Sequence, residues 1–216
     1  MKGLASRTCI VLIVLAALLT LPIAETASPA EAKRRPQTVT RTFRNATAIE
    51  LSIAPTPPVS ASLYPAPIPV RGLKGKIRDV NLHLNGLEHP YPDDVQVLLV
   101  GPRGQIAQVM GNVGGSTDVN DVTLRLDDEA AASLPNDTAL SSGTFNPTAA
   151  PGSTDIFNPP APLPRGNSAL SVFRGSNPNG TWRLFVQDED AASEPGSFAE
   201  GWALEITTKV KPRKRR

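Results

Sequence analysis

The sequence predicts an all-β fold with one β-sandwich domain, and three observations carry this prediction. Apolar residues recur at every second position in several segments beyond the N-terminal leader, which is the period of a half-buried strand. Prolines, 22 in all, exclude helices from segments such as residues 64–70. Both tryptophans lie in the last predicted pair of strands, where two large apolar rings would close a core.

The N-terminal segment has the features of a secretory signal peptide, which we place at residues 1–27. Lys2 and Arg7 precede an apolar run from Cys9 to Leu21, and small residues follow it. The run is shorter than the roughly 18 to 20 apolar residues that a membrane span requires, so an uncleaved anchor is the weaker alternative. The mature protein is therefore expected to be soluble, secreted and free of thiols.

Residues 28–42 combine Pro, Ala, Ser, Lys and Arg without a period, which predicts a basic linker. Order is expected to begin near Phe43, in a domain that extends to residue 208. Apolar residues alternate over Ile49, Leu51 and Ile53 as a first strand, which a run of prolines ends. The next segment, residues 64–70, is rich in proline and predicts an extended piece at a sheet edge.

Three strands are predicted in the middle of the domain. Residues 76–85 alternate and leave His83 on the polar face, and residues 95–99 and 122–126 alternate in the same way. The composition of residues 101–104 predicts a turn between two antiparallel strands.

A long surface loop is expected over residues 135–165, held to the domain by Phe145 and Phe157. Leu170 and Phe173 then return to the core.

The last element predicted is a hairpin of residues 180–188 and 198–206, joined by an acidic turn rich in Gly, Pro and Ser. Its two tryptophans are expected on the same inward face. The predicted structural core residues of this hairpin are Trp182, Leu184, Val186, Trp202 and Leu204.

These last residues, with Gly180-Thr181 before them and Asp188 and Gly196 between the strands, stand in an order that resembles the P domain, also called P/Homo B, of subtilisin-like proprotein convertases. A second part of the resemblance lies upstream. There the chain has a strand, a His/Tyr loop, an Asp-apolar pair and a Pro-x-Gly turn, carried by Ile77, Asp79, Val80, His89, Tyr91, Asp94, Val95, Val97, Leu99, Pro102 and Gly104.

The resemblance covers roughly residues 43–207 and implies a jelly-roll-like β-sandwich of the galactose-binding-like class. It also implies a module that packs on and stabilises a serine endopeptidase domain. This chain has no room for a separate peptidase domain, and no Gly-x-Ser-x-Gly elbow appears in it. Its two histidines, His83 and His89, have no nucleophile in a recognisable pattern, so no catalytic residues are assigned and the chain is expected not to be an enzyme.

Acidic loop residues are candidate calcium ligands, because Ca²⁺ takes carboxylate and carbonyl oxygens. No EF-hand spacing is present, and no cofactor is required by the sequence. Asp94 and Asp188, which recur in the family pattern, are the candidate metal ligands. The alternative is that these two carboxylates fix turns by accepting backbone N–H bonds.

The charge distribution suggests a partner. The formal net charge is +2, yet acidic residues outnumber basic ones within the domain, and the basic residues concentrate before it and in the tail at residues 209–216. Such a tail could tether the protein to an anionic envelope polymer or serve as a solubilising end. Because no aromatic residue is interleaved, nucleic acid is not expected as a partner.

Three functions remain open from the sequence. The first is a secreted, non-catalytic module for protein interaction or stabilisation. The second is an accessory domain acting in trans on a subtilisin-like serine endopeptidase, and the third is an unrecognised hydrolase.

Overall fold

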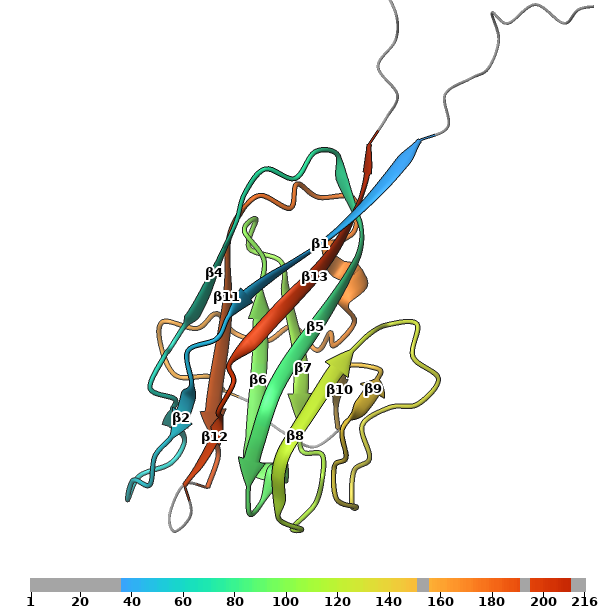
Figure 1. Ribbon diagram of the computed structural model, residues 1–216. Coiled ribbons are helices and arrows are strands. Elements are labelled where there is room, and N and C mark those ends of the chain that lie inside the picture. Colours follow the sequence, from blue (N-terminus) through green and yellow to red (C-terminus); the bar gives the residue numbers. More distant parts are fainter. Residues whose placement is uncertain (1–35, 151–155, 191–194, 211–216) are drawn as a thin grey trace, which may run out of the picture. The chain divides into compact units, whose positions relative to one another are not determined.

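The computed structural model describes residues 36–150, 156–190 and 195–210, which form a β-sandwich of two mixed sheets (Figure 1). In these ranges two short 3₁₀ helices, η2 (Pro92–Asp94) and η3 (Leu170–Phe173), accompany the strands. The strands are β1 (Gln37–Asn45), β2 (Ile49–Leu51), β3 (Val59–Ser60), β4 (Ala66–Val70), β5 (Lys76–His89), β6 (Val95–Val100), β7 (Ile106–Gly111), β8 (Val119–Leu126), β9 (Gly143–Phe145), β10 (Thr148–Ala149), β11 (Gly180–Asp188), β12 (Gly196–Phe198) and β13 (Trp202–Val210).

The first sheet has the order β1–β13–β5–β12–β2, with β8 also paired to β5 and β9 paired to β8. The second has the order β10–β7–β6–β11–β3, and β4 also pairs with β11. The inward faces of both sheets form one apolar core. The prediction of an all-β, jelly-roll-like sandwich is confirmed.

Both tryptophans belong to this core. Trp182 and Trp202 have no exposed surface, and Leu184, Val186 and Leu204 are buried with them. The predicted structural core is therefore confirmed residue by residue.

The predicted C-terminal hairpin is wrong. Strand β11 lies in the second sheet, where it pairs with β4 and β6, whereas β13 lies in the first sheet between β1 and β5. The chain crosses from one sheet to the other between these strands, so Trp182 and Trp202 enter the core from opposite sheets. Alternation indicates that one face of a strand is buried, but it does not tell which strands pair.

The predicted linker is too long at its C-terminal end. Residues 37–42 belong to β1, which pairs with β13 from Gln37 opposite Val210 to Asn45 opposite Trp202. Most side chains of β1 are exposed, because the backbone ladder holds this edge strand, and it therefore lacks the apolar alternation that marks a buried strand. Lys209 and Val210 likewise belong to β13 and not to a tail.

Residues 28–35 of the predicted linker lie outside the described residues, as do the signal peptide at residues 1–27 and the rest of the tail, residues 211–216.

Two further segments differ from expectation. Ile53 lies beyond the end of β2 and is 52% exposed, so it is not part of the first predicted strand. The expected surface loop at residues 135–165 contains the short strands β9 and β10. Its two predicted anchors do contact the domain, since Phe157 is buried and Phe145 packs partly against the core.

The outer faces of the two sheets differ in polarity. On the second sheet, Phe157 covers an apolar patch that is made of Leu98, Val100, Ile106 and Phe185. On the first sheet, the outward positions of β5, β8 and β13 carry charged and amide side chains instead. The outer face of the first sheet is therefore polar, whereas that of the second sheet is covered by apolar side chains.

Candidate functional site

The histidine that the sequence places in a loop is buried at the end of β5. His89 is 2% exposed, and its Nε2 lies 3.1 Å from Oδ2 of Asp188 on β11. Its Nδ1 accepts a hydrogen bond from the backbone N–H of Tyr91 at 3.1 Å. Because Nδ1 is an acceptor, Nε2 carries the ring proton of the neutral imidazole. This N–H donates a hydrogen bond to the Asp188 carboxylate.

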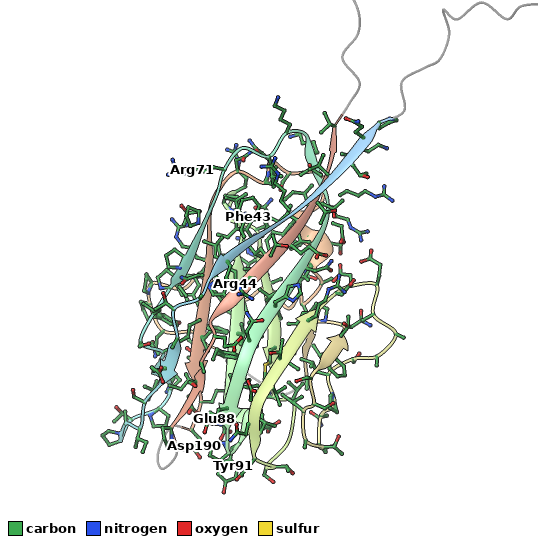
Figure 2. All side chains as sticks on the ribbon, viewed as in Figure 1. Phe43, Arg44, Arg71, Glu88, Tyr91 and Asp190 are labelled. Atoms are coloured by element: carbon green, nitrogen blue, oxygen red, sulfur yellow. The ribbon has the colours of Figure 1, made fainter. Side chains whose placement is uncertain are left out.

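This pair joins the two sheets, since β5 belongs to the first and β11 to the second. Figure 2 shows Glu88, Tyr91 and Asp190 at the lower end of the sandwich, which marks the place of the pair. The other oxygen of Asp188 accepts the backbone N–H of Asp190 at 3.0 Å. Gly196 packs so closely on the His89 ring that a Cβ at this position would overlap it.

The two predicted metal ligands, Asp94 and Asp188, are brought near each other at this end. Burial, together with repulsion from Asp188 and Asp190, raises the pKa of Asp94 to about 6. These three carboxylates therefore form a cluster of negative charge, and the cluster disfavours ionisation of Asp94.

Replacing Asp94 by asparagine is expected to stabilise the protein above pH 6. The folded-state pKa of about 6 lies above the ordinary value, so the folded state binds this proton more tightly than the unfolded chain. The resulting stability is present below about pH 4 and is lost as the pH rises through 6. At pH 7.5 the free energy of unfolding of the variant should exceed that of the wild type by on the order of 1 kcal/mol, after allowance for solvent screening of a half-buried group. At pH 4 the two proteins should be equally stable.

Urea melts of both proteins at the two pH values measure this difference. An equal gain at pH 4 and pH 7.5 would show that the effect does not come from ionisation of Asp94.

Calcium binding at the Asp94–Asp188 end stays a prediction. Both carboxylate oxygens of Asp188 already accept hydrogen bonds, and within residues 36–150, 156–190 and 195–210 no group of three His, Cys, Asp or Glu side chains is arranged to hold a metal. Millimolar Ca²⁺, with Mg²⁺ as control, is expected to raise the melting temperature by mass action if these carboxylates bind it. Asp94→Asn should then abolish the shift, and no shift in the wild type would leave them as turn-forming residues.

The other acidic stretch, residues 127–129, has protein partners throughout. Asp128 accepts the backbone N–H groups of Leu170 and Ser171 at the start of η3, at 2.8 and 2.7 Å. Asp127 contacts Arg125, and Glu129 contacts Arg174. Burial alone would raise the pKa of Asp127, but hydrogen bonds from the Glu129 backbone and from Arg125 outweigh it and hold that pKa below its ordinary value.

His83 lies on the outer face of β5, as the alternation predicts, and is half-buried. Burial and the neighbouring Arg125 guanidinium lower its pKa.

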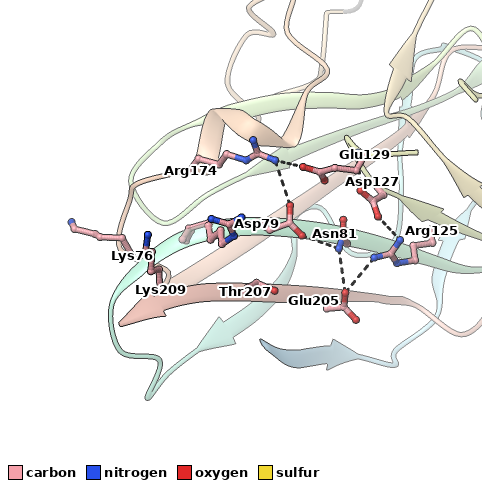
Figure 3. A pocket seen from close by; sticks show the side chains of 12 residues that line it. Lys76, Asp79, Asn81, Arg125, Asp127, Glu129, Arg174, Glu205, Thr207 and Lys209 are labelled. Carbon is pink, nitrogen blue, oxygen red and sulfur yellow. Dashed lines mark hydrogen bonds and ion pairs between the residues drawn. The ribbon is translucent and has the colours of Figure 1, made fainter. Parts of the chain in front are cut away.

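A groove with a volume of about 740 Å³ lies on the same outer face, among β5, β8, β13 and the residues that follow η3 (Figure 3). We call it the charged groove. It is lined by Lys76, Ile77, Arg78, Asp79, Asn81, Arg125, Asp127, Glu129, Arg174, Glu205, Thr207 and Lys209.

A chain of polar contacts runs along the charged groove. Asn81 donates to Asp79 at 3.1 Å and to Glu205 at 3.2 Å. Arg125 extends this chain from Glu205, at 3.3 Å, to Asp127. At the other end, Arg174 lies 3.7 Å from Asp79 and also contacts Glu129.

Several polar groups of the charged groove stand outside this chain of contacts. The Oδ1 atom of Asn81 has no hydrogen-bond partner in the described part of the protein, although the residue is 3% exposed. None of Lys76, Arg78 and Lys209 takes part in an ion pair of the described residues.

Sequence reasoning missed this groove. The polar positions of residues 76–85 were a signal for it, but its other walls come from strands whose pairing the alternation does not reveal.

In the described ranges no helix has both the length and the hydropathy needed to cross a membrane. Comparisons with models of protein families, with curated proteins and with solved structures found no match for this chain.

Proposed function

We propose that this protein is an extracellular, non-catalytic module of the P/Homo B type that binds and stabilises a partner outside the cell. The observation that carries the proposal is the buried pair of His89 and Asp188. These residues lie 99 positions apart in two separate stretches of the resemblance, and Asp94, from the upstream stretch, lies beside them. A motif whose members meet at one structural point supports kinship better than one whose members scatter.

The geometry of the histidine supports a role without catalysis. A general base needs a free ring nitrogen within hydrogen-bond reach of the proton that it removes. Both ring nitrogens of His89 are engaged, one by Asp188 and the other by the Tyr91 backbone. We therefore expect no turnover of casein or of dibasic peptides by the purified chain. Turnover that persists on repurification and is titrated by a serine-directed inhibitor would contradict the proposal.

The stabilising role is tested by capture from culture supernatant and envelope extract, with the chain from residue 33 to 216 as bait. A captured protein is expected to lose activity or structure more slowly on heating when the module is added back. The Trp182→Ala variant, in which a buried core side chain is removed, serves as the matched control. If the captured partner is a subtilisin-like protease, the module acts as an accessory domain in trans. If no captured partner is stabilised, the proposal fails.

The basic tail is expected to increase binding to anionic polymer. Residues 211–216 add five basic residues directly after Val210, the last residue of β13. At a Debye length of about 8 Å in physiological salt only close charge contacts persist, so binding should be salt-sensitive.

The intact chain should therefore elute from heparin resin at higher salt than a chain ending at Val210, with equal melting temperatures. The cut belongs after Val210 because an earlier one would remove part of β13. Equal elution of the two chains would show that the tail is not a tether, and a lower melting temperature of the shortened chain would show that the tail docks on the domain.

A further inference from the structure

We propose that the open edge of β1 binds an extended acidic segment of a partner protein. The segment would add a strand to the first sheet and place one carboxylate opposite Arg41 and another opposite Arg44. This inference rests on the proposed function, because it names how the module holds its partner. The residues that carry it belong to β1, and neither the charged groove nor the basic tail is involved.

Strand β1 is the longest open edge among the described strands. It pairs with β13 on one side and with no described strand on the other (Figure 1). The other strands that end the sheets are short, since β2, β3, β9 and β10 have two or three residues each. Strand β4 carries Pro67 and Pro69, which lack the N–H that a ladder needs. Strand β1 has nine residues and no proline, so its free side offers a row of backbone donors and acceptors.

This edge is held in an extended conformation before a partner binds. Its ladder with β13 runs over the whole length of β1. The hydroxyl groups of Thr40 and Thr207 lie 2.7 Å apart, and Asn45 donates to the Pro67 carbonyl at 3.0 Å. A strand that is already ordered loses little conformational entropy on binding.

One face of β1 offers apolar surface to an added strand. Phe43 packs partly against the core, and every second residue of β1 lies on the same side as Phe43. Val39 lies on that side opposite the buried Thr208, yet is itself 38% exposed. Arg41 stands between Val39 and Phe43. A segment with apolar residues opposite Val39 and Phe43 would cover both.

The edge also carries positive charge that the described residues do not neutralise. Neither Arg41 nor Arg44 takes part in an ion pair of the described part of the chain. The carboxylate of Glu205 on neighbouring β13 is engaged by Asn81 and Arg125. Because successive side chains of a strand alternate in direction, Arg41 and Arg44 lie on opposite faces. A complementary segment therefore carries acidic residues three positions apart.

Charge separates this partner from a second copy of the chain. Arg41 is the middle residue of Gln37–Asn45, so a centred antiparallel pairing of two β1 strands sets Arg41 opposite Arg41. Like charges in directly opposed positions destabilise a sheet, whereas opposite charges stabilise it. An acidic segment therefore fits this edge better than a second β1 does.

The test uses the fluorescein-labelled peptide Glu-Val-Thr-Glu-Thr-Val-Thr, whose residues in antiparallel pairing lie opposite Arg44 to Thr38 in turn. Polarisation titrations with the chain of residues 33–216 at low salt should show saturable binding below about 1 mM. A matched peptide with lysine in place of both glutamates should bind about tenfold more weakly or worse. No saturable binding of the acidic peptide would show that the arginines serve to guard the edge against aggregation, and would overturn the proposal.

Backbone methylation distinguishes strand addition from charge attraction. In an antiparallel pair, alternate residues of the peptide direct their N–H groups towards β1. One acidic peptide is N-methylated at its second, fourth and sixth residues, and another at its third, fifth and seventh. One of the two should lose about tenfold or more in affinity, and the other should stay within about threefold of the parent peptide. Equal binding of the two methylated peptides would overturn the proposal.

Charge reversal in the protein completes the test. Arg41→Glu/Arg44→Glu should weaken the acidic peptide about tenfold or more and bind the lysine peptide more tightly than the acidic one. The control Arg103→Glu/Arg165→Glu reverses two exposed arginines outside β1 and should change neither affinity by more than about twofold. If the charge-reversed variant fails to fold, Arg41→Gln/Arg44→Gln takes its place, with an expected loss of about fivefold for the acidic peptide.

Two further outcomes would overturn the proposal. The first is an unchanged affinity of the charge-reversed variant for the acidic peptide. The second is a dimer, detected by sedimentation, that the acidic peptide dissociates, because the edge would then belong to a second copy.

Failure of the proposed function gives a different result. The absence of a stabilised protein partner would contradict that proposal and leave the difference between the two methylated peptides intact. A captured partner that wild type and Arg41→Glu/Arg44→Glu stabilise equally would instead overturn this inference alone.

Discussion

Replacing Trp182 or Trp202 by alanine is expected to destabilise the protein by roughly 3 to 5 kcal/mol. Neither side chain has exposed surface, and the ring of Trp182 lies 4.8 Å from that of Phe173. Because the rings enter one core from opposite sheets, each deletion opens a cavity that the other sheet cannot fill without moving. For a domain of this size the melting temperature should fall by about 6 °C or more, measured by circular dichroism.

A matched pair of phenylalanine variants sharpens this prediction. The indole N–H of Trp182 donates to the Pro178 carbonyl at 3.0 Å, whereas that of Trp202 has no partner in the described residues. Trp182→Phe loses a hydrogen bond, and Trp202→Phe removes an unsatisfied buried donor, so Trp182→Phe should lower the melting temperature more. Ile53→Ala, at an exposed position, serves as the control. Alanine variants of both tryptophans that melt within about a degree of wild type would contradict the sandwich core.

Asp188→Ala is expected to cost roughly 1 to 3 kcal/mol, because it leaves the buried Nε2–H of the neutral His89 without its acceptor. The substitution also removes a contact between the two sheets, so the midpoint of unfolding should shift to a lower urea concentration. Asp190→Ala is the control. It keeps the backbone N–H that bonds Asp188 and removes only an exposed carboxylate, so it should be neutral or slightly stabilising.

The double variant His89→Ala/Asp188→Ala completes the comparison. If the pair acts as a unit, the decrease in the free energy of unfolding of the double variant should be much smaller than the sum of the decreases in the two single variants. Additive losses would show that His89 and Asp188 stabilise the fold independently.

The sequence by itself determined the fold class and the core. Strands with period-two alternation bury one face, and this holds whatever they pair with. For that reason Leu184, Val186 and Leu204 were correctly expected inside, as were the two tryptophans. The turn between residues 95–99 and the following strand was also predictable, because β6 and β7 are adjacent in sequence and pair directly.

Tertiary structure decided which strands meet. Strand β1 is held by its ladder with β13, and its exposed side chains leave no apolar pattern to read. The sequence predicted that β11 and β13 pair as a hairpin, but they lie in different sheets. Alternation with a period of two is the same in either sheet, so it could not indicate which strands pair. Pairing between distant strands depends on the whole core, which no local window contains.

The same limit applies to the sites. Asp94 and Asp188 were singled out as a pair only through the resemblance, and the burial of His89 against Asp188 and Gly196 followed from the contacts of the end of β5 with β11 and β12. The charged groove needed the register that sets Lys76 opposite Lys209 and Asn81 opposite Glu205. The residue types alone give the charge and the hydrogen-bonding capacity of the side chains. The distances between these side chains are set only when strands remote in sequence pair about 5 Å apart.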